Sequence, residues 1–341
     1  MNRPASVPPY LRASIVLAVA LAMTGSRGNA RIPPAVISSL AEPAAQKPST
    51  GSSPVSGDFA GLVTVAQGRG IYLQCSGAGG PTVILEAGLR VRDDYWSYNT
   101  AKTPEESVFP GIAKLTHVCE YDRPGTVIGE ALDQRSRSDP VPMPRSAISV
   151  VDDLHALVES AHLPRPFVLV GHSMGGLFVR IYALKYPGDV SGLVLVDALP
   201  DGLEHYLTAE QYALFVRLNT EIPPEMQSYK DYETIPFAPA FEALRILETK
   251  GSLKPMPLMI LSRGQPVALP SDVPPGFSAA LERAWRIQQD RLVKLELGAQ
   301  QVIATESDHY IMLRQPSLVI RAIRDVIDAV RAGKTQVESP T

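Results

Sequence analysis

Short apolar runs recur along this chain and alternate with stretches of helical periodicity. The runs lie at 82–86, 117–121, 167–170, 192–196, 257–262 and 301–304, and helices are predicted from about 146, 174, 277 and 316. Strands buried on both faces are apolar throughout, and they alternate with helices when a parallel sheet is covered on both sides. We therefore predict an α/β fold with a mostly parallel central sheet flanked by helices, opened by a hairpin at 62–75.

The segment 201–250 breaks this alternation. It contains helical stretches with several aromatic residues, and prolines interrupt it. We interpret it as a helical cap inserted over one end of the sheet. The predicted α/β core is then made of residues 59–200 and 251–335.

The first thirty residues have the pattern of a secretory signal peptide. Arg3 and Arg12 precede an apolar run at 13–23, and small residues follow up to Ala30. The run is about half of the ~20 residues that span a bilayer, so no stable membrane span is expected. We predict a signal peptide at 1–30, a disordered linker at 31–58, and export to the periplasm or the medium.

The charge balance disfavours nucleic acid as a partner, because a formal net charge of −3 leaves no basic excess. No group of His, Cys and Asp residues has the spacing of metal ligands. We therefore expect neither a metal nor an organic cofactor, and a small molecule as the substrate.

The segment 171–175 (GHSMG) fits the pattern G-x-S-x-G, between an apolar strand and a predicted helix. In this pattern a sharp turn from strand to helix holds the serine in a strained conformation, and flanking glycines avoid collisions. The hydroxyl is then exposed at a helix N-terminus, where main-chain N–H groups face a developing oxyanion. Ser173 is the predicted nucleophile.

Together with the segments 83–89 (VILEAGL), 121–125 (YDRPG), 193–197 (LVLVD) and 307–310 (SDHY), this motif resembles the α/β-hydrolase superfamily, in particular bacterial esterase-like and aminopeptidase-like members. The resemblance spans about residues 59–332. It implies the α/β-hydrolase fold and a triad in the chain order Ser, acid, His. At 121–125 it favours a structural role for Asp122 and Arg123, which would hold loops together.

The order of the triad implies that the base is a histidine late in the chain. His309 follows the last predicted strand and precedes the last helix, whereas the other five histidines lie in strands, in helices, beside Ser173 or in the insertion. His309 is therefore the predicted base. His172, next to the nucleophile, is expected to pack there or to shape the pocket.

Two residues are candidates for the acid. Asp197 directly follows the strand 192–196, and Asp272 lies in the loop after the strand 257–262. Members of the superfamily place the acid after either strand, and we favour Asp197. The carboxylate must accept a hydrogen bond from the histidine and stabilise the imidazolium.

The oxyanion hole requires two main-chain donors. The resemblance implies the N–H of Met174, after the nucleophile, and that of Leu89, in the loop after the strand 82–86. Relatives often carry His-Gly in this loop, and here the pair is Ala87-Gly88. The family topology also places Cys75 beside Cys119, and export permits a disulfide between them. Two buried free thiols are the alternative, and the sequence leaves the choice open.

The predicted function is hydrolysis of a small or medium carboxylic ester through an acyl-enzyme on Ser173. Two alternatives remain open from the sequence. One is an amide or peptide hydrolase similar to proline iminopeptidases, in which Glu204 or Glu210 would bind a substrate amine. The other is a member of the fold that binds ligands without catalysis.

Overall fold

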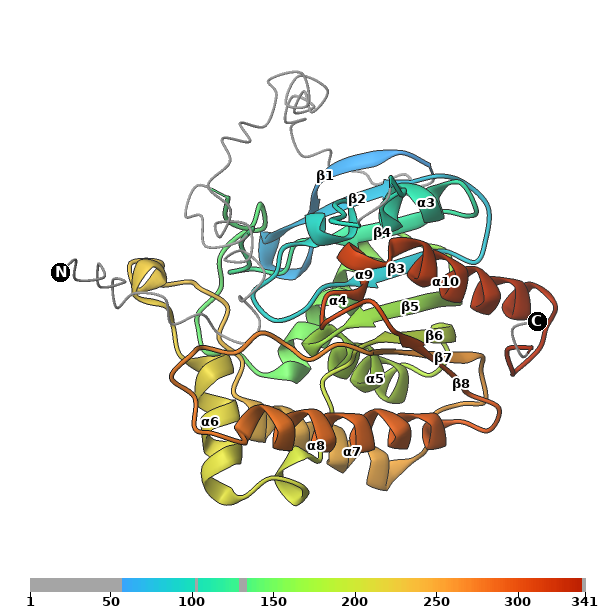
Figure 1. Ribbon diagram of the computed structural model, residues 1–341. Coiled ribbons are helices and arrows are strands. Elements are labelled where there is room, and N and C mark those ends of the chain that lie inside the picture. The colour runs from blue at the N-terminus through green and yellow to red at the C-terminus, as the bar shows by residue number, and fades with distance from the viewer. Residues whose placement is uncertain (1–56, 102–103, 129–133, 339–341) are drawn as a thin grey trace.

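The computed structural model describes residues 57–101, 104–128 and 134–338. The predicted signal peptide and almost all of the predicted linker lie outside these residues. Eight strands form one sheet in the order β1-β2-β4-β3-β5-β6-β7-β8 (Figure 1). β1 and β2 pair antiparallel, as do β2 and β4, and the remaining pairs are parallel. The predicted α/β-hydrolase fold is confirmed.

The bounds of the elements follow the alternation expected from the sequence. The strands are β1 (Phe59–Thr64), β2 (Gly70–Ser76), β3 (Val83–Glu86), β4 (Val118–Tyr121), β5 (Phe167–His172), β6 (Val190–Val196), β7 (Leu258–Arg263) and β8 (Gln300–Ala304). The α-helices are α3 (Val108–Ala113), α4 (Ala147–Ser160), α5 (Met174–Lys185), α6 (Ala209–Thr220), α7 (Phe237–Lys250), α8 (Phe277–Leu292), α9 (Ile311–Arg314) and α10 (Pro316–Arg331). The short 3-10 helices are η1 (Ala66–Gly68), η2 (Asp93–Trp96), η3 (Leu203–His205), η4 (Pro224–Met226) and η5 (Val293–Leu295).

Helices cover both faces of the sheet (Figure 1). α3, α9 and α10 pack on one face, and α4, α5, α7 and α8 lie on the other. Successive side chains of a strand point to opposite faces. In β5, Phe167 and Leu169 accordingly join the core under α4 and α5, while Val168 and Val170 join the core under α10. This double burial explains why the strand is apolar throughout.

The segment 201–250 has two parts with different surroundings. α6 contributes Phe215 to the core beside Phe237 and Trp285. α7 packs against α5 and α4, in the helical layer of that face of the sheet. The division of the chain into a core and a cap therefore stays a prediction.

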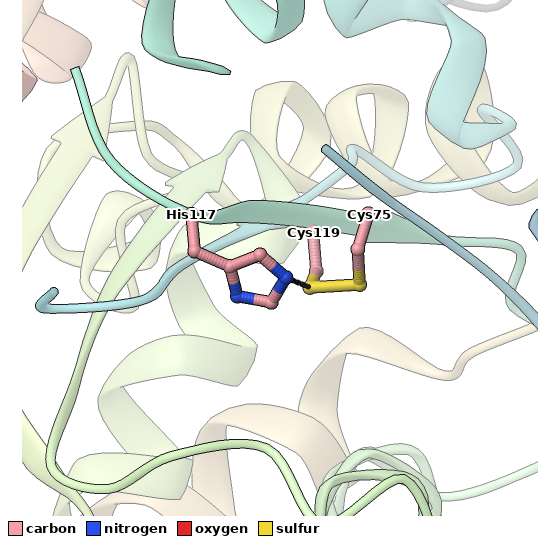
Figure 2. Close-up of side chains that lie close together, drawn as sticks. All are labelled: Cys75, His117 and Cys119. Carbon is pink, nitrogen blue, oxygen red and sulfur yellow. Dashed lines mark hydrogen bonds between the residues drawn. A yellow bond between two sulfur atoms is a disulfide. The ribbon is translucent and has the colours of Figure 1, made fainter. Parts of the chain in front are cut away.

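A disulfide joins Cys75 of β2 to Cys119 of β4, which are directly paired in the antiparallel register. The disulfide implied by the family topology is thus confirmed. Figure 2 shows His117 beside it, with Nε2 3.9 Å from the sulfur of Cys119. These three side chains are close enough to resemble a metal site, but both sulfurs are already bonded to each other. Among the described residues, no helix is long and apolar enough to cross a membrane.

Candidate active site

The predicted site residues lie at the carboxyl ends of neighbouring strands. Ser173 follows β5, Asp197 follows β6, and His309 lies between β8 and α9. Leu89 follows β3, which pairs with β5. In open parallel sheets, ligands bind outside the carboxyl ends of the strands. The topology thus gathers at one edge residues that are more than a hundred positions apart in sequence.

Ser173 occupies a strained turn between β5 and α5, with φ 53° and ψ −122°. The two flanking glycines are needed for close packing. A Cβ at Gly171 would lie 2.5 Å from the carbonyl oxygen of Gly175, and a Cβ at Gly175 would lie 2.5 Å from the carbonyl oxygens of Glu86 and Ala87. A side chain at either position would collide with main chain. The local geometry is that of a nucleophile elbow, and strain of this kind is concentrated at functional sites.

Asp197 and His309 are in direct contact. The Nδ1 atom of His309 lies 2.6 Å from Oδ2 of Asp197, and both side chains are buried. Asp197 also has a positive φ of 40°, which is uncommon for a residue other than glycine. Asp272, the other candidate acid, is exposed in the loop after β7. The structure therefore brings Asp197, and not Asp272, to the imidazole.

Two further partners of Asp197 were not expected from the sequence. Arg263 donates to Oδ2 through Nη1 at 2.8 Å, and Trp285 donates to Oδ1 through Nε1 at 2.9 Å. Arg263 is the last residue of β7, and β7 pairs with β6, the strand that Asp197 follows. A charged residue at the end of a predicted parallel strand could therefore have indicated a partner for Asp197. Trp285 comes from the middle of α8, and no sequence pattern indicates its contact.

These partners keep Asp197 ionised. Burial alone would raise the pKa of this carboxyl, but the charge of Arg263 and the hydrogen bond with His309 lower it below its usual value. Since Asp197 stays negative, its interaction with His309 becomes stronger when the imidazole takes up a proton.

His172 supports the segment that carries His309. Burial, with a smaller effect of the nearby His309 ring, lowers the pKa of His172 to about 3. The ring is therefore neutral near pH 7. Its Nε2 lies 2.9 Å from the carbonyl oxygen of His309, which can only accept, so Nε2 carries the proton and donates. His172 thus fixes the main chain of His309, in agreement with the expected packing role.

A cavity opens onto these residues. Ser173, His309, Leu89 and Met174 all line it, so the predicted nucleophile, the predicted base and both predicted oxyanion donors share one space. Most of the remaining wall is apolar and comes from α6, α7, α8 and neighbouring loops. It includes Leu199, Phe215, Phe237, Leu281 and Trp285.

Other residues considered from the sequence do not line this cavity. Glu204 is paired with Arg245, and Glu210 is exposed and accepts a hydrogen bond from Thr208. Neither carboxylate is thus placed to bind a substrate amine at Ser173.

Comparison with known proteins agrees with this geometry. The family model described as the alpha/beta hydrolase family matches residues 83–322. The chain is 26% identical over 257 residues to the uncharacterized protein YqjL of Bacillus subtilis, which covers 73% of this chain and 85% of YqjL. It is 32% identical over 161 residues to human monoacylglycerol lipase ABHD6, which covers 47% of this chain and 40% of the human protein.

A solved structure, that of alpha/beta hydrolase domain-containing protein 10 from mouse, superposes with a TM-score of 0.54 at 15% identity. The superposition covers 80% of this chain and 99% of the mouse chain, and at this identity it shows the fold alone. The family model, in contrast, covers more than half of the chain and includes strands β3 to β8, the elbow and the histidine described above. The chain therefore belongs to the alpha/beta hydrolase family.

Proposed function

We propose that this protein is an exported serine hydrolase that cleaves carboxylic esters through an acyl-enzyme on Ser173. The observation that carries the proposal is the 2.6 Å contact between His309 and Asp197, at the edge of a cavity that Ser173 also lines. In this proposal Ser173 is the nucleophile, His309 the base and Asp197 the acid of a triad.

The reaction has two halves. In the first, Oγ of Ser173 attacks the ester carbonyl while Nε2 of His309 takes up the hydroxyl proton, because Nδ1 is engaged by Asp197. His309 then donates this proton to the leaving alcohol. In the second, water repeats the attack on the acyl-enzyme, with His309 again as the base, and releases the carboxylic acid.

The negative charge of each tetrahedral intermediate needs stabilisation. We assign this role to the main-chain N–H groups of Leu89 and Met174, which both line the cavity with Ser173. Met174 is the first residue of α5, and the first N–H groups of a helix have no partner within it. Loss of one oxyanion donor typically costs about 10²–10³-fold in rate.

The wall of the cavity favours an apolar acyl group. Aromatic and aliphatic side chains such as Phe215, Phe237 and Leu281 line the same cavity as the nucleophile, and burial of apolar surface favours binding of a matching group. The name of the human relative, monoacylglycerol lipase, also supports an ester as substrate. An amide substrate with a free amine is not favoured, because Glu204 and Glu210 lie outside the cavity wall.

Export is part of the proposal for two reasons. The first thirty residues have the pattern of a signal peptide. The disulfide between Cys75 and Cys119 is of a kind that persists in oxidising compartments and is rare in the cytosol.

The test compares p-nitrophenyl esters of increasing chain length with aminoacyl anilides, using the wild type and Ser173→Ala. We expect ester turnover by the wild type and none above background by the variant. A fluorophosphonate probe should label the wild type at Ser173 only. Anilide turnover that exceeds ester turnover would move the assignment to amide hydrolysis, and an unlabelled wild type would reject the nucleophile.

A further inference from the structure

Arg123 is hydrogen-bonded to the loop that carries the proposed donor Leu89. It is 2% exposed and contacts three successive residues, the last of β3 and the two that follow it. Its Nη1 donates to Oε1 of Glu86 at 2.5 Å and to the carbonyl oxygen of Ala87 at 2.8 Å, and its Nη2 donates to the carbonyl oxygen of Gly88 at 2.5 Å. A single guanidinium thus binds the carboxylate of Glu86 and the main-chain carbonyls of Ala87 and Gly88.

The contact with Gly88 determines where the N–H of Leu89 points. The carbonyl of Gly88 and the N–H of Leu89 belong to one planar peptide unit, and in a trans peptide they point in opposite directions. The carbonyl also accepts from the N–H of Val91 at 3.2 Å. With the oxygen engaged on one side, the N–H is directed to the other side, and Leu89 lines the cavity with Ser173.

Glu233, which lies in the segment between α6 and α7, binds the same guanidinium. Its carboxylate accepts from Nε and Nη2 of Arg123 at 2.7 and 3.0 Å, and from the N–H of Arg90 at 2.6 Å. Arg90 has a positive φ of 66°, which is costly for a residue with a side chain. The hydrogen bond from its N–H to a fully buried carboxylate offsets part of that cost.

The side chain of Arg90 extends the same link to α6. Its Nη1 and Nη2 donate to the carbonyl oxygens of Glu221 and Thr220, at the C-terminal end of that helix. Hydrogen bonds thereby connect the loop after β3 to the segment 220–233 at its start, residues 220 and 221, and at its end, Glu233. Because Arg90, Arg123 and Glu233 are buried, the bonds among them are poorly exchangeable for bonds to water, and losing one leaves a charged group unpaired.

We propose that Arg123 and Glu233 are positioning residues of the oxyanion hole: together they orient the Gly88–Leu89 peptide so that its N–H faces the carbonyl oxygen of the substrate. The positive charge on the carbonyl side also polarises the peptide and strengthens its N–H as a donor. This inference rests on the proposed esterase function of the site.

The test uses the full-length protein with Glu233→Gln and Arg123→Lys, and Glu225→Gln as the control in the same segment, where the side chain is exposed. We expect kcat for a p-nitrophenyl ester to fall about 10-fold in Glu233→Gln and about 10²-fold in Arg123→Lys, by analogy with loss of an oxyanion donor. KM should change less than threefold. The affinity for a trifluoromethyl ketone, which adds Oγ of Ser173 and forms an oxyanion, should fall by the same factor as kcat/KM.

Two outcomes would overturn the inference. One is folded variants that keep the wild-type kcat and ketone affinity, and the other is a rise in KM with kcat unchanged, which would indicate a role in substrate binding. If Arg123→Lys does not fold, Glu233→Gln decides alone. If the wild type hydrolyses no ester, the proposed function has failed instead, and the NMR resonance of the Leu89 amide in Glu233→Gln then decides: an unchanged resonance contradicts the orienting role.

Discussion

At the scale of single residues, both oxygens of Asp197 are engaged. Oδ2 faces His309 and Arg263, and Oδ1 faces Trp285 and the N–H of Arg263. A carboxylate restrained from two sides cannot rotate away from the imidazole. The orientation of the proposed base thus depends on residues from β7 and α8 as well as on the triad.

Substituting Asp197 by Asn should lower kcat by about 10⁴-fold, because an amide can donate to Nδ1 and thereby select the wrong tautomer of His309. Steady-state kinetics with a p-nitrophenyl ester measures this effect. The matched control is Asp272→Asn, which should have wild-type kinetics because Asp272 is exposed outside the cavity wall. The reverse pattern would reassign the acid to Asp272.

His172 should make the folded protein sensitive to acid. Its pKa is lowered from 6.5 to about 3 on folding, so the unfolded chain binds a proton that the folded one excludes. This contribution to stability is present above pH 6.5 and is lost as the pH falls toward 3, by up to about 1.4 kcal/mol per pH unit. Urea unfolding at pH 7, 5.5 and 4.5 should show a smaller decline in His172→Gln than in the wild type, and parallel declines would contradict this.

At the scale of elements, the start of α5 is packed directly on the end of β3. Gly175 lies against the carbonyl oxygens of Glu86 and Ala87, and Gly176 against Ala198, so helix and loop are in main-chain contact. The elbow and the loop after β3 are therefore packed directly against each other, and we expect a change in one to displace the other.

Replacing Gly175 by Ala tests this contact. In an unhindered helix the change is favourable by about 1 kcal/mol, but here the new Cβ would lie 2.5 Å from two carbonyl oxygens. We expect a loss of more than about 10-fold in kcat as the loop shifts from its place. Gly188→Ala, in the turn after α5 with no atom within 4 Å of the new Cβ, should keep wild-type activity. Equal activity of both variants would show that the contact is dispensable.

Much at this scale could be predicted from the sequence, because local patterns determine it. The apolar run 167–170 and the GHSMG segment predict β5, the elbow and α5, and α4 begins where a helix is predicted from about 146. The packing of α7 on α5 could not be predicted, because an amphipathic helix in a cap and one on a sheet have the same periodicity. Glu233 and Trp285 were missed for a related reason: their partners are distant in sequence.

At the scale of the whole molecule, the disulfide fastens the antiparallel edge of the sheet to its parallel part. It closes a loop with a sequence separation of 44 and involves β2 and β4, away from the cavity wall. Such a bond is expected to act on the stability of the fold rather than on catalysis.

The double variant Cys75→Ser, Cys119→Ser should lose about 4 kcal/mol of unfolding free energy, the chain-entropy value for a loop of this length. Its kcat at 25 °C should match that of the wild type, because both residues lie outside the cavity wall. Thermal unfolding and ester kinetics on the same preparation measure the two quantities. Wild-type stability of the double variant would mean that the bond does not form in the protein as produced.

The buried carboxylate of Glu233 has a consequence for protein engineering. Residues 201–250 are a natural choice for exchange between relatives, because Phe215 and Phe237 line the proposed acyl pocket. In a chimaera whose foreign segment lacks this glutamate, the guanidinium of Arg123 would lose one of its two carboxylate partners and keep only Glu86. Donor segments for altered substrate range should therefore be chosen for an acidic residue at this one position, or be transplanted together with the segment around Arg123.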